Sequence, residues 1–233
     1  MISLIVPLYN EASQAEALVQ HLLTIDGIAE RILVDASNQA SSKQTIQRLA
    51  EKYQDDPSFK IVDAPQPGRS LQMNYGASLA SQPVLLFLHC DTRLPPDTVD
   101  LVTKSLNAQH QWGRFDIQLD RKQWPFRLIG AMVNLRSRVR NLATGDQAIF
   151  ITADLFKTAR GYPEIPLMED IALSKILSQH SPPSLITTPV TTSARRWEQS
   201  GITRTILLMW KLRLLFWLGH SPERLAAMYR TIR

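Results

Sequence analysis

The chain has 233 residues, of which 44% are hydrophobic and 20% are charged, an ordinary globular balance that allows a sizeable core. Its net charge of +5 favours anionic partners, which include nucleotides, nucleic acid and anionic lipid, without choosing among them. The single cysteine, Cys90, excludes an intramolecular disulfide, and no window reaches the ~18 uninterrupted apolar residues of a membrane-spanning helix.

The first half of the chain alternates short apolar runs with segments of helical periodicity. The apolar runs predict strands at residues 2–8, 31–35, 59–62 and 84–88. Between them, apolar residues at helical spacing predict helices at residues 12–23, 41–53 and 71–80. The run that ends before His89 is apolar throughout, as expected of a central strand buried on both faces. This alternation predicts a doubly wound parallel sheet with right-handed crossovers.

The second half is less regular. We expect helices at residues 97–108, 124–140, 168–178 and 202–218. The alternating run FDIQLD predicts a half-exposed antiparallel strand, a further strand is expected at residues 148–152, and one or two short strands are expected at residues 184–192. The whole predicts an α/β fold with a mostly parallel central sheet, helices on both faces and a smaller antiparallel element. We expect one domain over residues 1–233, divided into a nucleotide-binding half (1–95), an acceptor and catalytic half (96–200) and C-terminal amphipathic helices (201–233).

Several polar side chains directly follow the predicted parallel strands. Glu11, Asp35 and Asp91 come after three of these strands, and Arg69 lies in a loop that we expect on the same edge of the sheet. Because ligands bind at the carboxyl edge of open α/β sheets, these side chains should converge on one site. Carboxylates gathered with an arginine suit a nucleotide diphosphate held through Mg²⁺ or Mn²⁺. Each residue alone is better explained as structural, and their common placement favours the site.

Three further features each have two interpretations. Cys90 is either a thiol nucleophile or, as we favour, a small semi-buried residue at the end of a strand. Asp146 and Gln147 either bind hydroxyl groups of donor or acceptor or simply form a turn. Trp112 is either a stacking platform for a sugar or a rim residue that covers the core.

An ordered set of motifs resembles one known family. In chain order the motifs are SLIVPLYNE, ILVDAS, GRSLQMNYGA, LFLHCDTRLPPD, TGDQAIFI, GYPEIPLMEDIALS and the segment Arg195-Arg196-Trp197. Over nearly the whole chain they resemble a family 2 glycosyltransferase, and more narrowly the bacterial subgroup of radical-SAM/selenodomain-associated transferases 2. The resemblance implies a GT-A fold, a nucleotide-sugar donor with a UDP-sugar favoured, a Mg²⁺ or Mn²⁺ cofactor, and inversion at the anomeric carbon.

The resemblance also assigns donor-binding roles in the first half. The base or ribose would be bound by Asp35, and the metal by Asp91. The remaining donor contacts would come from Pro7, Tyr9 and Glu11 at the nucleotide and from Arg69 and Asn74 at the pyrophosphate.

Two departures from the family pattern concern this donor site. His89 stands where the first metal-binding carboxylate usually is. The segment Asp35-Ala36-Ser37-Asn38-Gln39 lacks the glycine and the second carboxylate that usually follow the second strand. The donor identity is therefore open.

Glu169 and Asp170 match the acidic pair of the family, with Asp170 as the candidate general base. A carboxylate within hydrogen-bond reach of an acceptor hydroxyl can take its proton during attack. An acid in the first turn of a helix also complements the helix dipole, so capping is the competing interpretation. Arg196 and Trp197 resemble a segment found in processive relatives, without its glutamine.

Two functions remain open on the sequence. The first is a metal-dependent glycosyltransferase that acts on an unknown hydroxyl acceptor. The second is a catalytically impaired nucleotide-binding or membrane-docked module of the same fold, which the altered Asp35 loop and His89 favour. Basic residues are not interleaved with aromatic residues in a recognisable nucleic-acid motif, so we expect no nucleic-acid partner.

The apolar tail at residues 202–218 has two possible contacts. Three cations, Arg204, Lys211 and Arg213, argue against a spanning helix. The tail either packs on the sheet, as we favour, or lies in a membrane interface, where the helix at 124–140 could extend the surface. Because the N-terminus lacks the basic region of a signal peptide, we expect a cytoplasmic protein, with the inner face of the cell membrane as its contact.

Overall fold

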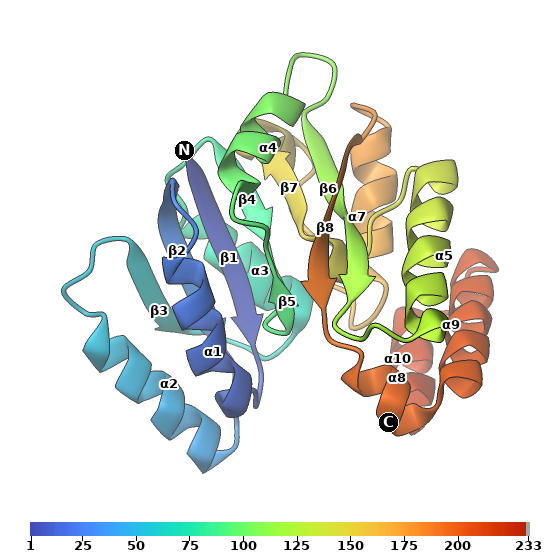
Figure 1. Ribbon diagram of the computed structural model, residues 1–233, viewed down its shortest axis with the longest axis horizontal. Helices are drawn as coiled ribbons and strands as arrows, with labels where there is room; N and C mark the ends of the chain where they lie inside the picture. Colours follow the sequence, from blue (N-terminus) through green and yellow to red (C-terminus); the bar gives the residue numbers. More distant parts are fainter. Residues whose placement is uncertain (232–233) are drawn as a thin grey trace.

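The first half of the chain forms a parallel sheet with its crossover helices. The computed structural model describes residues 1–231 (Figure 1). Its first four strands are all paired in parallel, and they are β1 (Ile2–Leu8), β2 (Ile28–Asp35), β3 (Phe59–Asp63) and β4 (Val84–Phe87). The helices between them are α1 (Ala12–Leu23), α2 (Ala40–Lys52) and α3 (Arg69–Ser78). The predicted βαβ succession is confirmed.

The second half extends the same sheet with strands of mixed direction. These strands are β5 (Thr92–Arg93), β6 (Trp112–Leu119), β7 (Ile149–Thr152) and β8 (Ser184–Thr192). Within the described residues the sheet has eight strands in the order β3-β2-β1-β4-β7-β6-β8-β5. β7 runs antiparallel to both β4 and β6, whereas β8 runs parallel to β6. The predicted mostly parallel sheet with a smaller antiparallel element is thereby confirmed.

The helices of the second half surround one end of the sheet. They are α4 (Thr98–Ser105), α5 (Trp124–Arg140), α6 (Ala153–Thr158), α7 (Glu169–Ser178), α8 (Arg195–Ser200), α9 (Ile202–Trp217) and α10 (Pro222–Thr231). A 3₁₀ turn, η1 (Gly145–Gln147), precedes β7. In Figure 1 the helices α5, α7, α8, α9 and α10 lie together at the side of the molecule opposite to α2.

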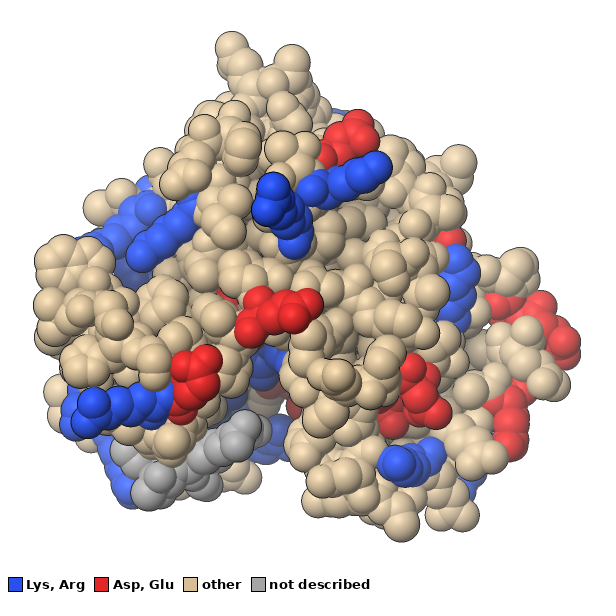
Figure 2. All heavy atoms as spheres, turned by 180° about the vertical axis from the view of Figure 1, so that it is seen from behind, with Lys and Arg blue, Asp and Glu red and all other residues tan. Residues whose placement is uncertain are grey.

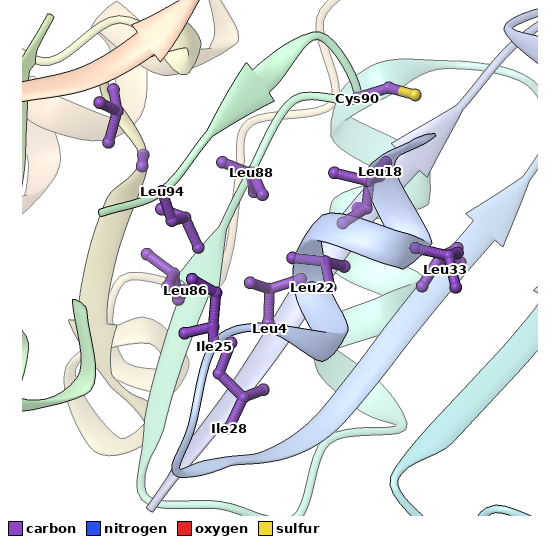
Figure 3. Packing of buried hydrophobic residues seen from close by; sticks show 14 of the residues in the cluster. Leu4, Leu18, Leu22, Ile25, Ile28, Leu33, Leu86, Leu88, Cys90 and Leu94 are labelled. Carbon is purple, nitrogen blue, oxygen red and sulfur yellow. The ribbon is translucent and has the colours of Figure 1, made fainter. Parts of the chain in front are cut away.

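Buried apolar side chains fill both faces of the sheet. One cluster packs α1 onto β1, β2 and β4, with Leu18 and Leu22 against Leu4, Leu33 and Leu86 (Figure 3). A second cluster packs α3, α6 and α7 onto the other face. This two-sided burial explains why β1 and β4 are continuous apolar runs. The sheet edge that follows these strands is therefore held on a rigid support.

The strand β6 corrects the prediction made from its alternating sequence. A half-exposed antiparallel strand was expected, but seven of its eight residues are buried, and Arg114 is 1% exposed. Asp116 is buried because it forms an ion pair of 2.9 Å with Arg114 and also pairs with Arg138, although Nε and Nη2 of Arg114 have no hydrogen-bond partner among the described residues. Gln118 and Asp120 are exposed, so within the run FDIQLD the expected alternation fails at Asp116.

The tail helix α9 packs with one face and exposes the other. Its buried face lies against α7 and α10, through a cluster with Met168, Ile171, Leu212 and Leu225 as members. We expected α9 to pack on the sheet, but it packs on other helices instead. No helix among the described residues has the length and apolarity needed to cross a membrane.

Candidate functional site

A cavity of about 420 Å³ opens beyond the ends of the central strands. Its walls come from the loop after β4, the turn η1, the start of α7, the helix α8 and the facing sides of α5 and α9. The charged lining residues are Arg69, Asp91, Arg136, Asp146, Glu169, Asp170, Arg196 and Arg213. Figure 2 shows a hollow at the lower edge of the molecule, with positive and negative side chains inside it. Residues from both halves of the chain thus meet in one site.

Asp170 lies in the wall of this cavity at the start of α7. Its Oδ2 accepts a hydrogen bond of 2.8 Å from the backbone N–H of Gly145, and its Oδ1 accepts one of 2.7 Å from the N–H of Ile171. These bonds fix the carboxylate and join α7 to η1. Burial nonetheless raises the pKa of Asp170 above its usual value, and the neighbouring Asp146 raises it further. A fixed carboxylate with a raised pKa is suited to accept a proton.

Glu169 points toward a different partner from that of Asp170. It is 4% exposed, and its Oε1 lies 3.5 Å from the guanidinium of Arg69 at the start of α3. Burial and the nearby Asp170 both raise the pKa of Glu169. The pair ties α7 to α3 and points the Arg69 side chain into the cavity wall. Glu169 is therefore placed to position Arg69 rather than to reach a substrate hydroxyl.

The backbone just before this acidic pair is strained. Met168 has φ 68°, in the left-handed region that residues other than glycine seldom adopt. Its side chain is buried among α7, α9 and α10, and this packing holds the conformation. Strained backbone of this kind is found where the surrounding structure imposes a particular geometry, often at functional sites.

The turn η1 contributes Gly145 and Asp146 to the cavity wall. A Cβ atom on Gly145 would overlap the ring of His89, so only glycine fits at this point. Burial lowers the pKa of His89 well below its usual range, and the charges of Arg69 and Arg196 lower it further, so the ring is neutral. Nε2 of His89 is buried without a hydrogen-bond partner among the described residues. Where the family pattern has a carboxylate, this chain places a neutral ring that packs on η1.

The predicted nucleotide-binding residues gather at the adjoining edge of β1 and β2. Leu8 and Asp35 are paired across these strands, so Pro7, Tyr9 and Asp35 lie close to one another. Asp35 is 3% exposed, and its Oδ1 accepts hydrogen bonds from the N–H (3.2 Å) and the hydroxyl (2.6 Å) of Ser37. Tyr9 is 48% exposed and is free to pack against a ligand.

The loop after β2, which departs from the family pattern, is held by hydrogen bonds from side chains. Asn10, with φ 56°, accepts hydrogen bonds at Oδ1 from the backbone N–H groups of Asn38 and Gln39. The N–H of Asn10 donates to the hydroxyl of Ser37 at 2.8 Å. The loop is thus held by side chains, and this hydrogen bonding compensates for the glycine that the family pattern has here.

Glu11 links the nucleotide edge to the loop after β4. Burial and the charge of Asp91 raise the pKa of Glu11. The thiol of Cys90 lies against Glu11, is 2% exposed, and has a pKa raised by burial, so it stays protonated. The expectation of a small strand-end residue holds for Cys90, and a thiolate nucleophile is disfavoured.

Three residues that the sequence proposed for ligand contact are used in the scaffold. Trp112 is 0% exposed and donates from Nε1 to the carbonyl of Ser181 at 2.7 Å, so neither a sugar platform nor a rim position is correct. Gln147 is also 0% exposed, and its Oε1 accepts hydrogen bonds from the hydroxyl of Ser137 and from Thr144. The amide of Asn74 bonds both the N–H and the C=O of Tyr162. None of the three lines the cavity.

Asp146, Arg196 and Trp197 do line the cavity. Oδ1 of Asp146 is buried without a hydrogen-bond partner among the described residues, so it is available to a ligand. The guanidinium of Arg196 lies 5.5 Å from the ring centre of Tyr229 in a cation–π contact. The three residues thus face the cavity, and their contact with a substrate stays a prediction.

Two arginines in the cavity wall were missed by sequence reasoning. Arg136 comes from α5 and Arg213 from α9, and both helices carry several other basic residues. The available signal was weak, because helical periodicity shows which residues share a face and not which helices will face each other. Only the packing of α5 opposite α9 brings the two side chains to one cavity.

The donor set around Asp91 fits a divalent cation whose other ligands belong to a substrate. No group of three or more His, Cys, Asp or Glu side chains within residues 1–231 is arranged to hold a metal ion. Mg²⁺ and related cations commonly take one or two carboxylates and complete their shell with phosphate oxygens and water. Asp91 lines the cavity and supplies such a carboxylate, with Glu11 nearby.

Comparisons with known proteins agree with this geometry. Residues 3–116 match the family model described as glycosyl transferase family 2. No curated protein matches the chain significantly.

Solved structures similar to this chain have the GT-A fold. One is a mannosyltransferase from Pyrobaculum calidifontis in complex with GDP-Man and Mn²⁺, with a TM-score of 0.61, 19% identity, and coverage of 82% of this chain and 56% of that one. Another is TarS 1-349 from S. aureus, with a TM-score of 0.65, 19% identity, and coverage of 83% and 60%. TarS 1-349 has also been solved with UDP-GlcNAc, with a TM-score of 0.63, 19% identity, and coverage of 82% and 58%. The chain therefore covers 56% to 60% of the length of these solved chains.

Proposed function

We propose, because the chain belongs to glycosyltransferase family 2, that it transfers a sugar from a nucleotide-sugar donor to a hydroxyl acceptor, with inversion at the anomeric carbon. One observation carries the proposal: Asp91 and Asp170, from opposite halves of the chain, line the same cavity together with Arg69. In this proposal Asp91 lies on the donor side, and Asp170 lies where an acceptor can reach it. Similar solved proteins hold GDP-Man or UDP-GlcNAc, and a UDP-sugar is our favoured donor.

In the proposed reaction the acceptor oxygen attacks the anomeric carbon of the donor. The bond from this carbon to the diphosphate oxygen breaks, and the nucleoside diphosphate leaves. Asp170 takes the proton of the attacking hydroxyl, which is otherwise a poor nucleophile near neutral pH. Arg69 offsets charge on the leaving diphosphate, and its ion pair with Glu169 holds it there. The proposed donor contacts are Pro7, Tyr9, Glu11 and Asp35, and acceptor or sugar contacts come from Asp146, Arg196 and Trp197.

A divalent cation, Mg²⁺ or Mn²⁺, is part of the proposal. Asp91 would hold it, and when bound the ion would supply positive charge to the leaving diphosphate. We expect UDP to bind more tightly with Mn²⁺ than with EDTA, and we expect Asp91→Ala to abolish this difference. Calorimetry measures both affinities. Asp97→Ala, at an exposed acid of the same loop region, is the matched control. Equal affinity of the wild-type chain for UDP with EDTA and with Mn²⁺ would contradict the metal proposal.

A catalytically impaired nucleotide-binding module is the competing function. A thermal-shift screen of nucleotides and nucleotide-sugars with and without Mn²⁺ finds the donor, because a ligand that binds the folded state raises the melting temperature. Release of nucleoside diphosphate from the stabilising donor then separates the two functions. If the donor bound but no nucleoside diphosphate were released with any acceptor tested, the impaired module would be favoured.

We also propose that α5 and α9 contact a membrane surface. Exposed apolar side chains follow helical spacing along both helices: Trp124, Leu128, Met132, Leu135 and Val139 on α5, and Leu207, Trp210, Leu214 and Trp217 on α9. Both helices border the cavity, and exposed cations, Arg127, Arg138, Arg140, Arg204 and Lys211, flank the apolar residues. Apolar and basic residues together on one surface fit the interface of an anionic bilayer.

The membrane contact can be tested on two exposed tryptophans. Trp210 and Trp217 are 56% and 71% exposed, so Trp210→Glu with Trp217→Glu should leave the melting temperature nearly unchanged. We expect the double variant to lose most co-sedimentation with anionic vesicles at low salt, because it loses apolar anchors and adds negative charge. Leu23→Glu, at an exposed residue of α1 far from α9 (Figure 1), should bind normally. If the wild-type chain leaves no lipid-bound fraction, the membrane contact is wrong.

A further inference from the structure

The cavity holds two arginines that the proposed donor chemistry does not use. Arg136 projects from α5 and Arg213 from α9, so they approach the cavity from its two helical walls. Nε of Arg213 is buried without a hydrogen-bond partner, and its guanidinium has no ion pair with any residue that the structure describes. Among the described residues Arg136 donates to two neutral hydroxyls, those of Ser137 (3.1 Å) and Thr144 (3.5 Å).

The two guanidinium groups also repel each other. Burial lowers the pKa of Arg213 to about 10, and the charge of Arg136 is the next largest cause. Arg136 likewise has a pKa lowered by burial, although Asp146 and Asp170 act in the opposite direction. Two partly buried cations that form no ion pair within residues 1–231 are costly to a folded chain, and an anion between them would relieve this cost. A phosphate suits the position, because its oxygens match the donor fork of arginine.

The walls next to this arginine pair are apolar. Ile129, Met132 and Val133 line the cavity from α5, and Ile206, Met209 and Trp210 line it from α9. Met132 and Trp210 are also members of the exposed apolar rows on the two helices. An apolar path therefore runs from the proposed membrane surface to the arginine pair, which lies close to Asp146 and Asp170. A single ligand can place a chain in this path and a charged head at its inner end.

We infer that Arg136 and Arg213 form a second anion site, distinct from the donor diphosphate site, for the phosphate of an amphiphilic acceptor whose apolar chain lies between α5 and α9. This inference rests on the proposed glycosyl transfer and names the acceptor class for it. The phosphate anchors the acceptor, and a hydroxyl beside it is presented to Asp170. The basic residues on the outer surface then attract the same anionic membrane from which the acceptor is taken.

Calorimetry with three soluble probes tests the site: decyl phosphate below its critical micelle concentration, decanol, and inorganic phosphate. Decyl phosphate should bind at least about tenfold more tightly than decanol or inorganic phosphate, a difference in binding free energy of about 1.4 kcal/mol. Arg136→Gln and Arg213→Gln should each weaken decyl phosphate at least about tenfold. Arg127→Gln, which removes an exposed cation from the same helix α5, should bind like the wild-type chain. Inorganic phosphate binding as tightly as decyl phosphate would overturn the amphiphilic acceptor.

Measurements of UDP binding distinguish this site from the donor site. UDP should still bind to Arg136→Gln and Arg213→Gln, whereas Arg69→Gln should weaken UDP and leave decyl phosphate unchanged. Decyl phosphate that competes with UDP and is lost in Arg69→Gln would overturn the second site. Failure of UDP to bind any variant or the wild-type chain would count against the proposed function alone.

Folding of the variants is checked by their melting temperatures. Because the Arg213 guanidinium has no hydrogen-bond or ion-pair partner in the described part of the chain, Arg213→Gln should melt at the same temperature as the wild-type chain or higher. Arg213→Lys keeps the charge without the planar fork, and it should retain part of the affinity for decyl phosphate. An Arg213→Gln variant that is less stable and yet binds decyl phosphate normally would show that Arg213 is structural, which overturns the site.

Discussion

Replacement of Asp170 by asparagine should reduce sugar transfer by about 10²–10⁴-fold, which is the usual effect of losing a general base. Asparagine keeps the shape of the side chain and can still accept the hydrogen bond that Gly145 donates. It cannot accept the proton of the attacking hydroxyl. Affinity for the donor, measured by calorimetry, should be nearly unchanged, because in the proposed reaction Asp170 contacts the acceptor.

The pH dependence of transfer gives a second readout for the same residue. Burial raises the pKa of Asp170, so the acid limb of the rate should lie above the ordinary range of an aspartate. The base acts when deprotonated, and activity is therefore lost as the pH falls through this raised pKa. For stability the sign is opposite: the folded chain holds the proton more tightly than the unfolded chain, so the carboxylate costs stability once the pH rises through its pKa. Asp170→Asn removes this cost at neutral pH but also loses one of the two backbone hydrogen bonds, because the amide nitrogen that then faces the N–H of Ile171 cannot accept it.

Glu169→Gln is the matched control for this prediction. It lies one residue away, is buried, and pairs with Arg69, so its loss should weaken the donor interaction and move the apparent KM more than the pH profile. If Asp170→Asn kept most of its transfer activity while Glu169→Gln abolished it, the base would be Glu169. If both variants were fully active, neither carboxylate would be the base.

The first half of the fold could be predicted well because its signals are local. Each strand of the β1–β4 set is a short apolar run, and each crossover helix has apolar residues at helical spacing. The carboxylates that follow these strands are brought to one edge by the parallel pairing alone, as Leu8 and Asp35 illustrate. No knowledge of long-range packing is needed for such an arrangement.

The second half could be predicted less well because packing, and not the local pattern, decides which of its polar residues are buried. Asp116 occupies a polar position of an alternating run and is nevertheless buried in an ion pair with Arg114. Gln147 and Trp112 look like surface groups in the sequence, but both are buried and bonded, Gln147 to Ser137 and Trp112 to Ser181. Arg136 and Arg213 meet only because α5 and α9 face each other across the cavity. Local patterns identify the elements but not the partners of their side chains.

Replacement of Gly145 by alanine should impair both stability and transfer. The new Cβ would overlap the buried ring of His89, so either the ring or the turn η1 must move. Overpacking of this kind lowers the free energy of unfolding by about 1–3 kcal/mol, which denaturant titration measures. Movement of the turn also displaces the N–H that holds Asp170. Because misplacement of a reacting group by about 1 Å can cost about 10²-fold in rate, we expect a large loss of transfer.

Two further variants separate this steric effect from a general effect of added methyl groups. Gly130→Ala places its Cβ at ordinary contact distance, 3.4 Å from the carbonyl oxygen of Ile117, and should be neutral or slightly stabilising because alanine favours a helix. His89→Ala removes the ring that obstructs residue 145, so the double variant should be less impaired than the sum of the single variants. The coupling free energy between contacting residues in a double-mutant cycle is typically about 0.5–3 kcal/mol. Strict additivity, or a Gly145→Ala variant with normal stability and transfer, would show that the contact between η1 and His89 does not position Asp170.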